Sequence, residues 1–254
     1  MARYSAVLFD MFDTLVRFDR RLLPVSTIGG REVRSSAPIL HSIAAPALPG
    51  VDLETFYDAF LWSYEEAERI RADTHEEVPA HGRLEIFYRH LGVDPAAIPP
   101  AVTERLLATH MACLAGAAEP MPGQGELLDW LKDRCRLGVV SNFDYTPTVR
   151  RILAEEGILG RFGTVVVSDE VGWRKPQPVI FRQALTDLGV TAEECLFVGD
   201  RPEIDVAGAK AMGMAAAWLN PDRAPLPPGL PTPDLDLAGL AELRPALEPY
   251  LKGS

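Results

Sequence analysis

The sequence has 254 residues, of which 47% are hydrophobic and 24% charged, and its 25 basic and 36 acidic residues give a formal net charge of −11. This length and composition are typical of a soluble globular protein, either one large domain or a domain with an insertion, and they exclude disordered and fibrous classes. The acidic surplus disfavours binding to nucleic acid or to an anionic membrane surface.

The cysteines and the N-terminus indicate a reducing compartment. Cys113, Cys135 and Cys195 are scattered without paired spacing, which predicts free thiols rather than disulfides or a zinc site. The short apolar run before Asp10 is too brief for a signal peptide or a membrane span. We therefore expect a cytoplasmic protein with no membrane segment, and the sequence leaves its oligomeric state open.

Five short apolar runs predict buried parallel strands, joined in the second half of the chain by helical crossovers. The runs cover residues 6–9, 137–140, 165–167, 195–198 and 214–218. Apolar residues at helical spacing predict helices over residues 125–132 and 178–188. Together these elements predict an α/β fold with a doubly wound, Rossmann-like parallel sheet.

The interval between the first two predicted strands, residues 17–119, carries no comparable strand signal. Asp52 is expected to cap a first helix, and two further helices are expected around residues 84–91 and 102–111. We interpret this interval as an inserted α-helical cap domain.

Residues 25–50 differ from the rest of the interval, because they combine glycine, serine and proline with little periodicity. They predict a lid-like loop, a disordered connector or a plain flexible surface loop. The expected division is therefore a catalytic core of residues 1–16 and 120–254 with a helical cap of residues 17–119.

Polar residues follow the carboxyl ends of the predicted strands, where open parallel sheets bind ligands. They are Asp10 after the first strand, Ser141 and Asn142 at the second, Lys175 after the third, and Asp200 and Asp205 after the fourth. Each alone has an ordinary structural explanation, such as a helix cap or a solvated loop lysine. Together they predict a cation site, because clustered carboxylates raise one another's pKa unless a cation holds them. Hard oxygen ligands without a nearby His or Cys favour Mg²⁺.

These residues stand in four motifs that resemble those of the haloacid-dehalogenase-like hydrolases, specifically the members with a helical cap inserted after the first strand. The motifs are Val7-Leu8-Phe9-Asp10-Met11-Phe12-Asp13-Thr14-Leu15, Val139-Val140-Ser141-Asn142, Lys175-Pro176, and Val198-Gly199-Asp200-Arg201-Pro202-Glu203-Ile204-Asp205. They occur in the family's order, and the resemblance spans nearly the whole chain.

The resemblance implies a role for each residue. Asp10 is the expected nucleophile, which attacks phosphorus to form an aspartyl-phosphate, while Lys175 neutralises Asp10 and the transferring group. Ser141 is expected to hydrogen-bond a phosphoryl oxygen and, with Asn142 and Lys175, to bind the substrate.

The resemblance also implies the metal ligands. Mg²⁺ is expected to be held by Asp10, the Phe12 backbone carbonyl and Asp200, with Asp205 supporting the metal shell. The implied function is Mg²⁺-dependent hydrolysis of a small phosphorylated metabolite.

Phe12 is the main departure from the family pattern. Phosphatases of this family carry a second aspartate at this position, which protonates the leaving oxygen and then activates water. Such general acid–base catalysis is worth about 10²–10⁴-fold. Asp13, where the family usually has glycine, can supply the proton only if the loop turns its side chain inward.

An aromatic residue at position 12 also resembles the 2-haloacid dehalogenases of the same superfamily. In those enzymes the counterpart of Asp10 displaces halide from carbon, and no leaving-group proton is required. Gly199-Asp200 differs, however, from the serine-rich fourth motif of the dehalogenases. A third alternative is a weakened member that binds a phosphorylated ligand without turnover, which the retained nucleophile, lysine and metal aspartates disfavour.

Overall fold

The computed structural model describes residues 4–251 and shows two compact units. The core unit contains the chain up to Arg17 and again from Glu119 onward, and the inserted unit is Phe18–Ala118. Each unit buries apolar side chains of its own. The two crossings between the units are strands that pair with each other, β2 (Val16–Phe18) and β5 (Ala118–Pro120).

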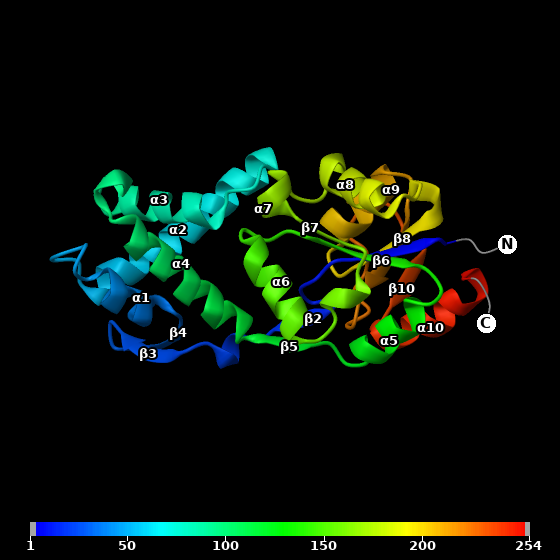
Figure 1. The fold of residues 1–254 in the computed structure, drawn as a ribbon, viewed down its shortest axis with the longest axis horizontal. Helices are drawn as coiled ribbons and strands as arrows, with labels where there is room; N and C mark the ends of the chain where they lie inside the picture. Colours follow the sequence, from blue (N-terminus) through cyan, green and yellow to red (C-terminus); the bar gives the residue numbers. More distant parts are fainter. Residues whose placement is uncertain (1–3, 252–254) are drawn as a thin grey trace. The chain divides into compact units, whose positions relative to one another are not determined.

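A six-stranded parallel sheet forms the centre of the core unit, in the order β10-β9-β8-β1-β6-β7 (Figure 1). The strands are β1 (Ala6–Phe9), β6 (Arg136–Ser141), β7 (Thr164–Val167), β8 (Cys195–Gly199), β9 (Ala215–Leu219) and β10 (Leu235–Leu237). Four of them are buried at every residue, as expected for parallel strands covered on both faces. The predicted α/β, Rossmann-like fold class is confirmed.

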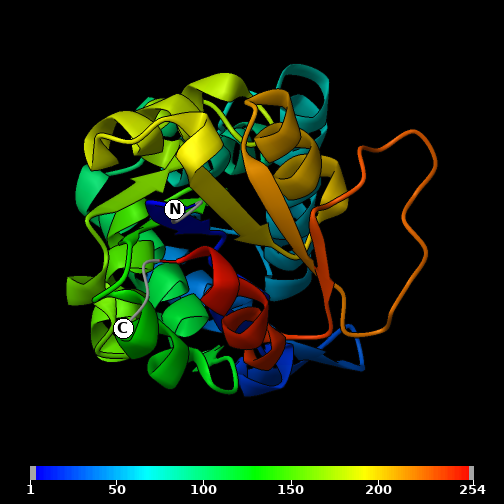
Figure 2. The same ribbon diagram turned by 90° about the vertical axis from the view of Figure 1, so that its right-hand side faces the viewer.

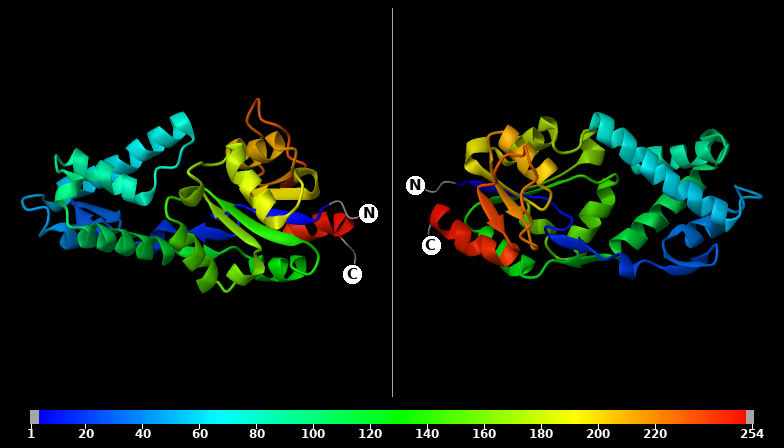
Figure 3. Two further views of the ribbon diagram at one scale, coloured as in Figure 1. Left: turned by 45° about the horizontal axis from the view of Figure 1, so that its top comes forward. Right: turned by 180° about the vertical axis from the view of Figure 1, so that it is seen from behind.

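Helices lie on both faces of this sheet (Figures 2 and 3). One face carries α8 (Pro178–Leu188) and α9 (Ala207–Ala211), and the other carries α5 (Gln124–Leu131), α6 (Thr146–Glu155) and α10 (Leu240–Leu247). The short α7 (Ser168–Val171) directly follows β7. A long loop between β9 and β10, drawn in orange in Figure 2, contains no helix or strand, which agrees with its proline-rich sequence.

β1 lies at the point where the strand order reverses. It pairs with β6 on one side and with β8 on the other. The loops that follow these three strands therefore leave the same edge of the sheet side by side, where α/β proteins bind ligands. Asp10, Ser141 and Asp200 occupy these three strand ends.

Four helices make up most of the inserted unit: α1 (Ala37–Ala44), α2 (Leu53–Thr74), α3 (Ala80–His90) and α4 (Pro100–Ala115). The predicted cap of α2 is confirmed, since Asp52 Oδ1 accepts a hydrogen bond from the Thr55 N–H at 2.8 Å. Phe56 and Phe87 pack edge to face between α2 and α3, with ring centroids 4.8 Å apart. Within residues 4–251, no helix combines the length and apolar character that a membrane crossing requires.

The expectation of an irregular segment over residues 25–50 is wrong. This segment contains a β-hairpin of β3 (Val25–Ile28) and β4 (Arg31–Arg34), followed by α1. Its turn is Gly29-Gly30, with φ of 55° and 74°, and glycine adopts this conformation without strain. The inserted unit is therefore not free of strands. Both hairpin strands are short and largely polar, so neither gives the apolar run that marked the core strands.

Candidate active site

Asp10 directly follows β1, in a tightly turned loop. Its N–H donates to the Val198 carbonyl of the neighbouring β8 at 2.8 Å, and its side chain is mostly buried. In the loop, the N–H groups of Leu15 and Val16 both donate to the Met11 carbonyl, at 2.8 and 2.9 Å. These bonds fix the backbone from which the Asp10 carboxylate extends.

The loop after α7 carries Lys175, and Asn142, directly after β6, holds the backbone of that lysine. Asn142 Oδ1 accepts from the Lys175 N–H at 2.7 Å, and Asn142 Nδ2 donates to the Lys175 carbonyl at 3.0 Å. Both polar groups of the Asn142 side chain are thus engaged with another loop. The structure gives Asn142 a part in positioning Lys175, whereas its contact with substrate stays a prediction.

Lys175 Nζ lies between two carboxylates, 2.6 Å from Asp10 Oδ1 and 2.8 Å from Asp205 Oδ1. The lysine side chain is completely buried. Burial by itself lowers the pKa of a lysine, but the charges of Asp10 and Asp205 outweigh it and raise the pKa of Lys175 above its usual value. Lys175 is therefore held as an ammonium ion.

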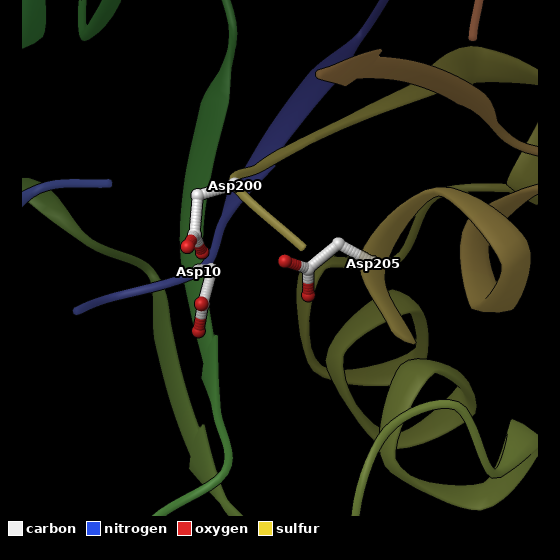
Figure 4. A group of neighbouring side chains, drawn as sticks. All are labelled: Asp10, Asp200 and Asp205. Carbon is white, nitrogen blue, oxygen red and sulfur yellow. The ribbon is translucent and has the colours of Figure 1, made fainter. Parts of the chain in front are cut away.

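The side chains of Asp10, Asp200 and Asp205 converge on one point (Figure 4), where one oxygen of each lies within 4.8 Å of the others. Burial and the charges of Asp10 and Asp205 raise the pKa of Asp200 to about 8. Burial also raises the pKa of Asp205 to about 6, although Lys175 opposes this rise. One lysine offsets only one of three negative charges, so the cluster lacks positive charge.

This donor set fits a hard divalent cation such as Mg²⁺. Carboxylate oxygens are the ligands that Mg²⁺ prefers, and their mutual repulsion is what a bound cation relieves. Asp200 makes no ion pair within residues 4–251 and is therefore the carboxylate most in need of one.

Gly199, the last residue of β8, makes room for Asp205. A Cβ at position 199 would lie 2.4 Å from both Cγ and Oδ2 of Asp205, so no larger residue fits there. Asp205 lies in the π-helical turn η5 (Pro202–Val206), and its Oδ2 accepts from the Arg201 N–H at 3.0 Å. The missing side chain at position 199 thus lets a fully buried carboxylate reach Lys175.

Ser141 ends β6 with a buried hydroxyl. Its Oγ has no hydrogen-bond partner within the described residues, and the Oγ1 of Thr14, in the loop after β1, is buried in the same way. Buried polar groups in proteins nearly always have a partner. The Ser141 hydroxyl is therefore free to bond an oxygen of a ligand.

Phe12 has an aromatic ring at the position where the family resemblance led us to expect a carboxyl. Its ring stacks on that of Phe143, with centroids 5.2 Å apart and planes inclined by 27°. The next residue, Asp13, is exposed and has φ of 55°, a left-handed conformation that glycine adopts more easily. Its charge adds to the rise in the pKa of Asp200, so Asp13 acts on the cluster electrostatically.

The structure brings most of the residues singled out in the sequence to one edge of the sheet. Lys175 contacts Asp10 and Asp205, and an oxygen of Asp200 lies within 4.8 Å of oxygens of both carboxylates. Ser141 ends the strand β6, and Asn142 directly follows it. Sequence reasoning missed the stacking partner Phe143 and the steric need for Gly199. The glycine directly before Asp200 was a usable signal, because glycine weakens a buried strand unless close approach requires it.

A model of the haloacid dehalogenase-like hydrolase family matches residues 4–213. The chain belongs to this family. It is 32% identical over 165 residues to a pyrimidine 5′-nucleotidase of Escherichia coli, covering 64% of this chain and 68% of that protein. It is 30% identical over 217 residues to a glyceraldehyde 3-phosphate phosphatase of Methanopyrus kandleri, covering 85% and 84%.

Solved structures of the family share this fold. A haloacid dehalogenase-like (HAD) phosphatase from Thermococcus onnurineus superimposes with a TM-score of 0.66 at 26% identity, over 96% of this chain and 97% of that one. A 2-haloacid dehalogenase from Pseudomonas syringae gives a TM-score of 0.72 at 22% identity, over 97% and 99%. The second likeness concerns the fold alone. The chain is thus a HAD-like hydrolase.

Replacing Gly199 with alanine should damage both the fold and the site. The new Cβ would overlap Asp205, and such overpacking costs about 1–3 kcal/mol. Urea unfolding measures this loss. The matched control is Gly125→Ala in α5, where a Cβ meets nothing within 4 Å and where alanine should add about 0.5–1 kcal/mol of stability. Equal unfolding midpoints for Gly199→Ala and the wild type would contradict the steric argument.

The metal-free protein should lose stability as the pH rises from about 4 toward 8. The pKa of Asp200 is raised from 3.8 to about 8 in the folded state, so the folded protein keeps a proton that the unfolded chain releases. This contribution is complete below the unfolded pKa and is lost as the pH rises through the folded one. With a chelator present, the melting temperature of the wild type should fall as the pH rises, and it should fall less in Asp200→Asn. An identical decline in both proteins would contradict the assignment.

Proposed function

We propose that this hydrolase is a Mg²⁺-dependent phosphatase that acts on a small phosphorylated metabolite through an aspartyl-phosphate on Asp10. The observation that carries the proposal is the contact of Lys175 with Asp10 and Asp205. It places a fixed positive charge beside a carboxylate at the carboxyl edge of the sheet, and the unpartnered Ser141 hydroxyl ends the adjacent strand. The phosphatase and nucleotidase relatives support the same reaction class.

The first half-reaction needs an oxygen of Asp10 to attack phosphorus while the bond from phosphorus to the leaving oxygen breaks. Lys175 neutralises Asp10 in the resting state and the phosphoryl oxygens during transfer. Ser141 donates its hydroxyl hydrogen to one phosphoryl oxygen. Water then attacks the aspartyl-phosphate at phosphorus, which releases phosphate and regenerates the carboxylate.

Asp10, Asp200 and the Phe12 carbonyl are the groups that would hold Mg²⁺, with Asp205 supporting them. When bound, the ion supplies positive charge that stabilises the transferring phosphoryl group. Within the loop after β1, backbone N–H groups donate to the carbonyls of Met11 and Val16. This pattern leaves the Phe12 carbonyl for the metal.

Phe12 shapes the choice of leaving group in this proposal. A phenyl ring cannot protonate a leaving alkoxide, and the exposed Asp13, the next residue in the chain, is the first candidate to do so. Substrates whose leaving groups are already stable anions, such as acyl or aryl phosphates, need no such proton. The proposed enzyme therefore favours good leaving groups unless Asp13 reaches them.

The same experiments test two alternative functions. The stacked Phe12–Phe143 pair favours a 2-haloacid dehalogenase, because displacement of halide needs no proton and an apolar wall suits a halocarbon. A binding protein without turnover is the other alternative. A panel of phosphate esters and 2-haloacids, assayed with and without Mg²⁺, separates the three.

The inserted unit is proposed to act as a cap domain that selects the substrate. The compact unit 18–118 supports the proposal of a cap over residues 17–119. Named relatives act on a pyrimidine nucleotide and on glyceraldehyde 3-phosphate, both small phosphorylated molecules. We extend that chemical class, and no single compound, to this chain.

Mg²⁺ should bind at the carboxylate cluster and raise the melting temperature, because a ligand that binds only the folded state stabilises it. Asp200→Asn should weaken Mg²⁺ binding at least roughly tenfold, since it removes a ligand charge. Isothermal titration calorimetry and thermal shift measure both effects. Asp133→Asn is the matched control, because this exposed residue precedes β6 at the opposite edge of the sheet. If the wild-type protein shows neither binding nor a change in melting temperature at millimolar Mg²⁺, the dehalogenase alternative is favoured.

Phe12→Asp should increase the hydrolysis of alkyl phosphates by up to about 10²–10⁴-fold, because it restores a general acid beside the leaving oxygen. Hydrolysis of aryl phosphates should change far less. In the wild type, loss of the base for the second half-reaction should make aspartyl-phosphate accumulate, visible as a burst in stopped-flow kinetics.

Efficient hydrolysis of alkyl phosphates by the wild type would show that another group supplies the proton. Asp13→Asn then identifies that group if activity falls while Mg²⁺ binding is kept. A dehalogenase would gain nothing from Phe12→Asp on either class of phosphate ester.

A further inference from the structure

Trp218 contacts the backbone of the proposed metal ligand Asp200, although it lies outside the four family motifs. It belongs to β9, where it pairs in register with Gly199 of β8. Its side chain is buried with 6% exposure, and its indole Nε1 donates a hydrogen bond to the Asp200 carbonyl at 2.8 Å. A side chain of β9, the strand beside β8, thus reaches the loop that carries Asp200.

With this hydrogen bond, both polar groups of the peptide between Asp200 and Arg201 are hydrogen-bonded to side chains. The Asp200 carbonyl and the Arg201 N–H belong to the same planar peptide group. Trp218 donates to the carbonyl, and Asp205 Oδ2 accepts from the N–H at 3.0 Å. Because both edges of the plane are fixed, the direction in which the Asp200 side chain leaves the backbone is restricted as well.

Asp200 needs such a restraint more than its neighbours do. Asp10 and Asp205 are each drawn inward by Lys175, whereas Asp200 has no ion pair in the described chain and is repelled by both. It also follows a glycine, the residue with the freest backbone. Without a backbone anchor, repulsion would turn the Asp200 carboxylate away from the cluster.

We propose that Trp218 is a positioning residue for Mg²⁺ binding, which acts by holding the Asp200–Arg201 peptide so that the Asp200 carboxylate faces Asp10. This inference rests on the proposed function, because it takes Asp200 as a ligand of the metal. Trp218 touches neither substrate nor metal in this role. Its effect is to lower the cost of arranging the ligands before the cation arrives.

A purely structural role for Trp218 is the competing explanation, since the indole also packs in the apolar core between the sheet and α8. A buried indole N–H needs some partner, whatever the function. The two explanations differ in what happens when only the N–H is removed. Packing depends on the shape of the ring system, whereas positioning depends on the hydrogen bond.

The test compares Mg²⁺ binding by calorimetry in four full-length proteins. They are the wild type, Trp218→Phe, a protein with benzothienylalanine at position 218, and Trp130→Phe. Benzothienylalanine keeps the two fused rings and replaces the N–H by sulfur. Trp130, on α5, is the control because its indole lies against Arg134, which follows that helix, and Arg244 of α10, with guanidinium carbons 4.9 and 5.3 Å from the ring.

Both position-218 variants should bind Mg²⁺ about three- to tenfold more weakly, the effect of losing one hydrogen bond, and Trp130→Phe should bind as the wild type does. With p-nitrophenyl phosphate as the probe substrate, both position-218 variants should need a higher Mg²⁺ concentration for half-maximal rate, whereas their kcat should change less. Equal Mg²⁺ affinity in wild type and benzothienylalanine protein would overturn the role of Trp218 alone. Failure of both position-218 variants to fold would also overturn it in favour of packing. A wild type without Mg²⁺ affinity would overturn the proposed function together with it.

Discussion

A lysine ammonium enclosed between two carboxylates is the interaction on which the rest of the site depends. Lys175 is completely buried, and its contacts with Asp10 and Asp205 offset the cost of burying its charge. Removing Lys175 would leave the buried carboxylates of Asp10 and Asp205 without their shared positive charge, so the three side chains are constrained as a set. The remaining geometry serves this set: Asn142 fixes the lysine backbone, and Gly199 leaves space for the second carboxylate.

The topology of the sheet explains why side chains so distant in sequence can form such a set. Three adjacent strands deliver their following residues to one edge, and the hydrogen bonds of the loops then set the directions of individual side chains. Hydrogen bonds to the backbone therefore determine how precisely the site side chains are placed. The Asp10 N–H is tied to the Val198 carbonyl, and the Asp200 carbonyl is tied to Trp218. A site held in this way needs little rearrangement when a charged ligand enters.

The sequence predicted those features that follow from periodicity and from motif position. Buried strands are continuous apolar runs, so five strands of the core sheet were found to within one residue at each end, whereas the short edge strand β10 was not predicted. Asp52 was recognisable as a cap by its position before an amphipathic stretch. The hairpin at Gly29-Gly30 was missed because its short strands are largely exposed and polar, although the two glycines were a turn signal. The stacking of Phe12 on Phe143 was out of reach, since contacts between loops depend on side-chain packing that no local pattern encodes.

The charge balance of the site distinguishes phosphoryl transfer from dehalogenation better than does the lack of an acid–base residue at position 12. Asp10, Asp200 and Asp205 carry three negative charges when ionised, and Lys175 returns one positive charge. A phosphate monoester adds nearly two further negative charges near neutral pH, so its binding and that of a divalent cation reinforce each other. A 2-haloacid adds one negative charge and offers the cation no phosphoryl oxygens to hold. A dehalogenase therefore has no evident use for Asp200, whose burial among like charges is costly without a cation. Retention of this unpaired carboxylate, held in place by a buried indole, supports phosphoryl transfer as the chemistry of the site.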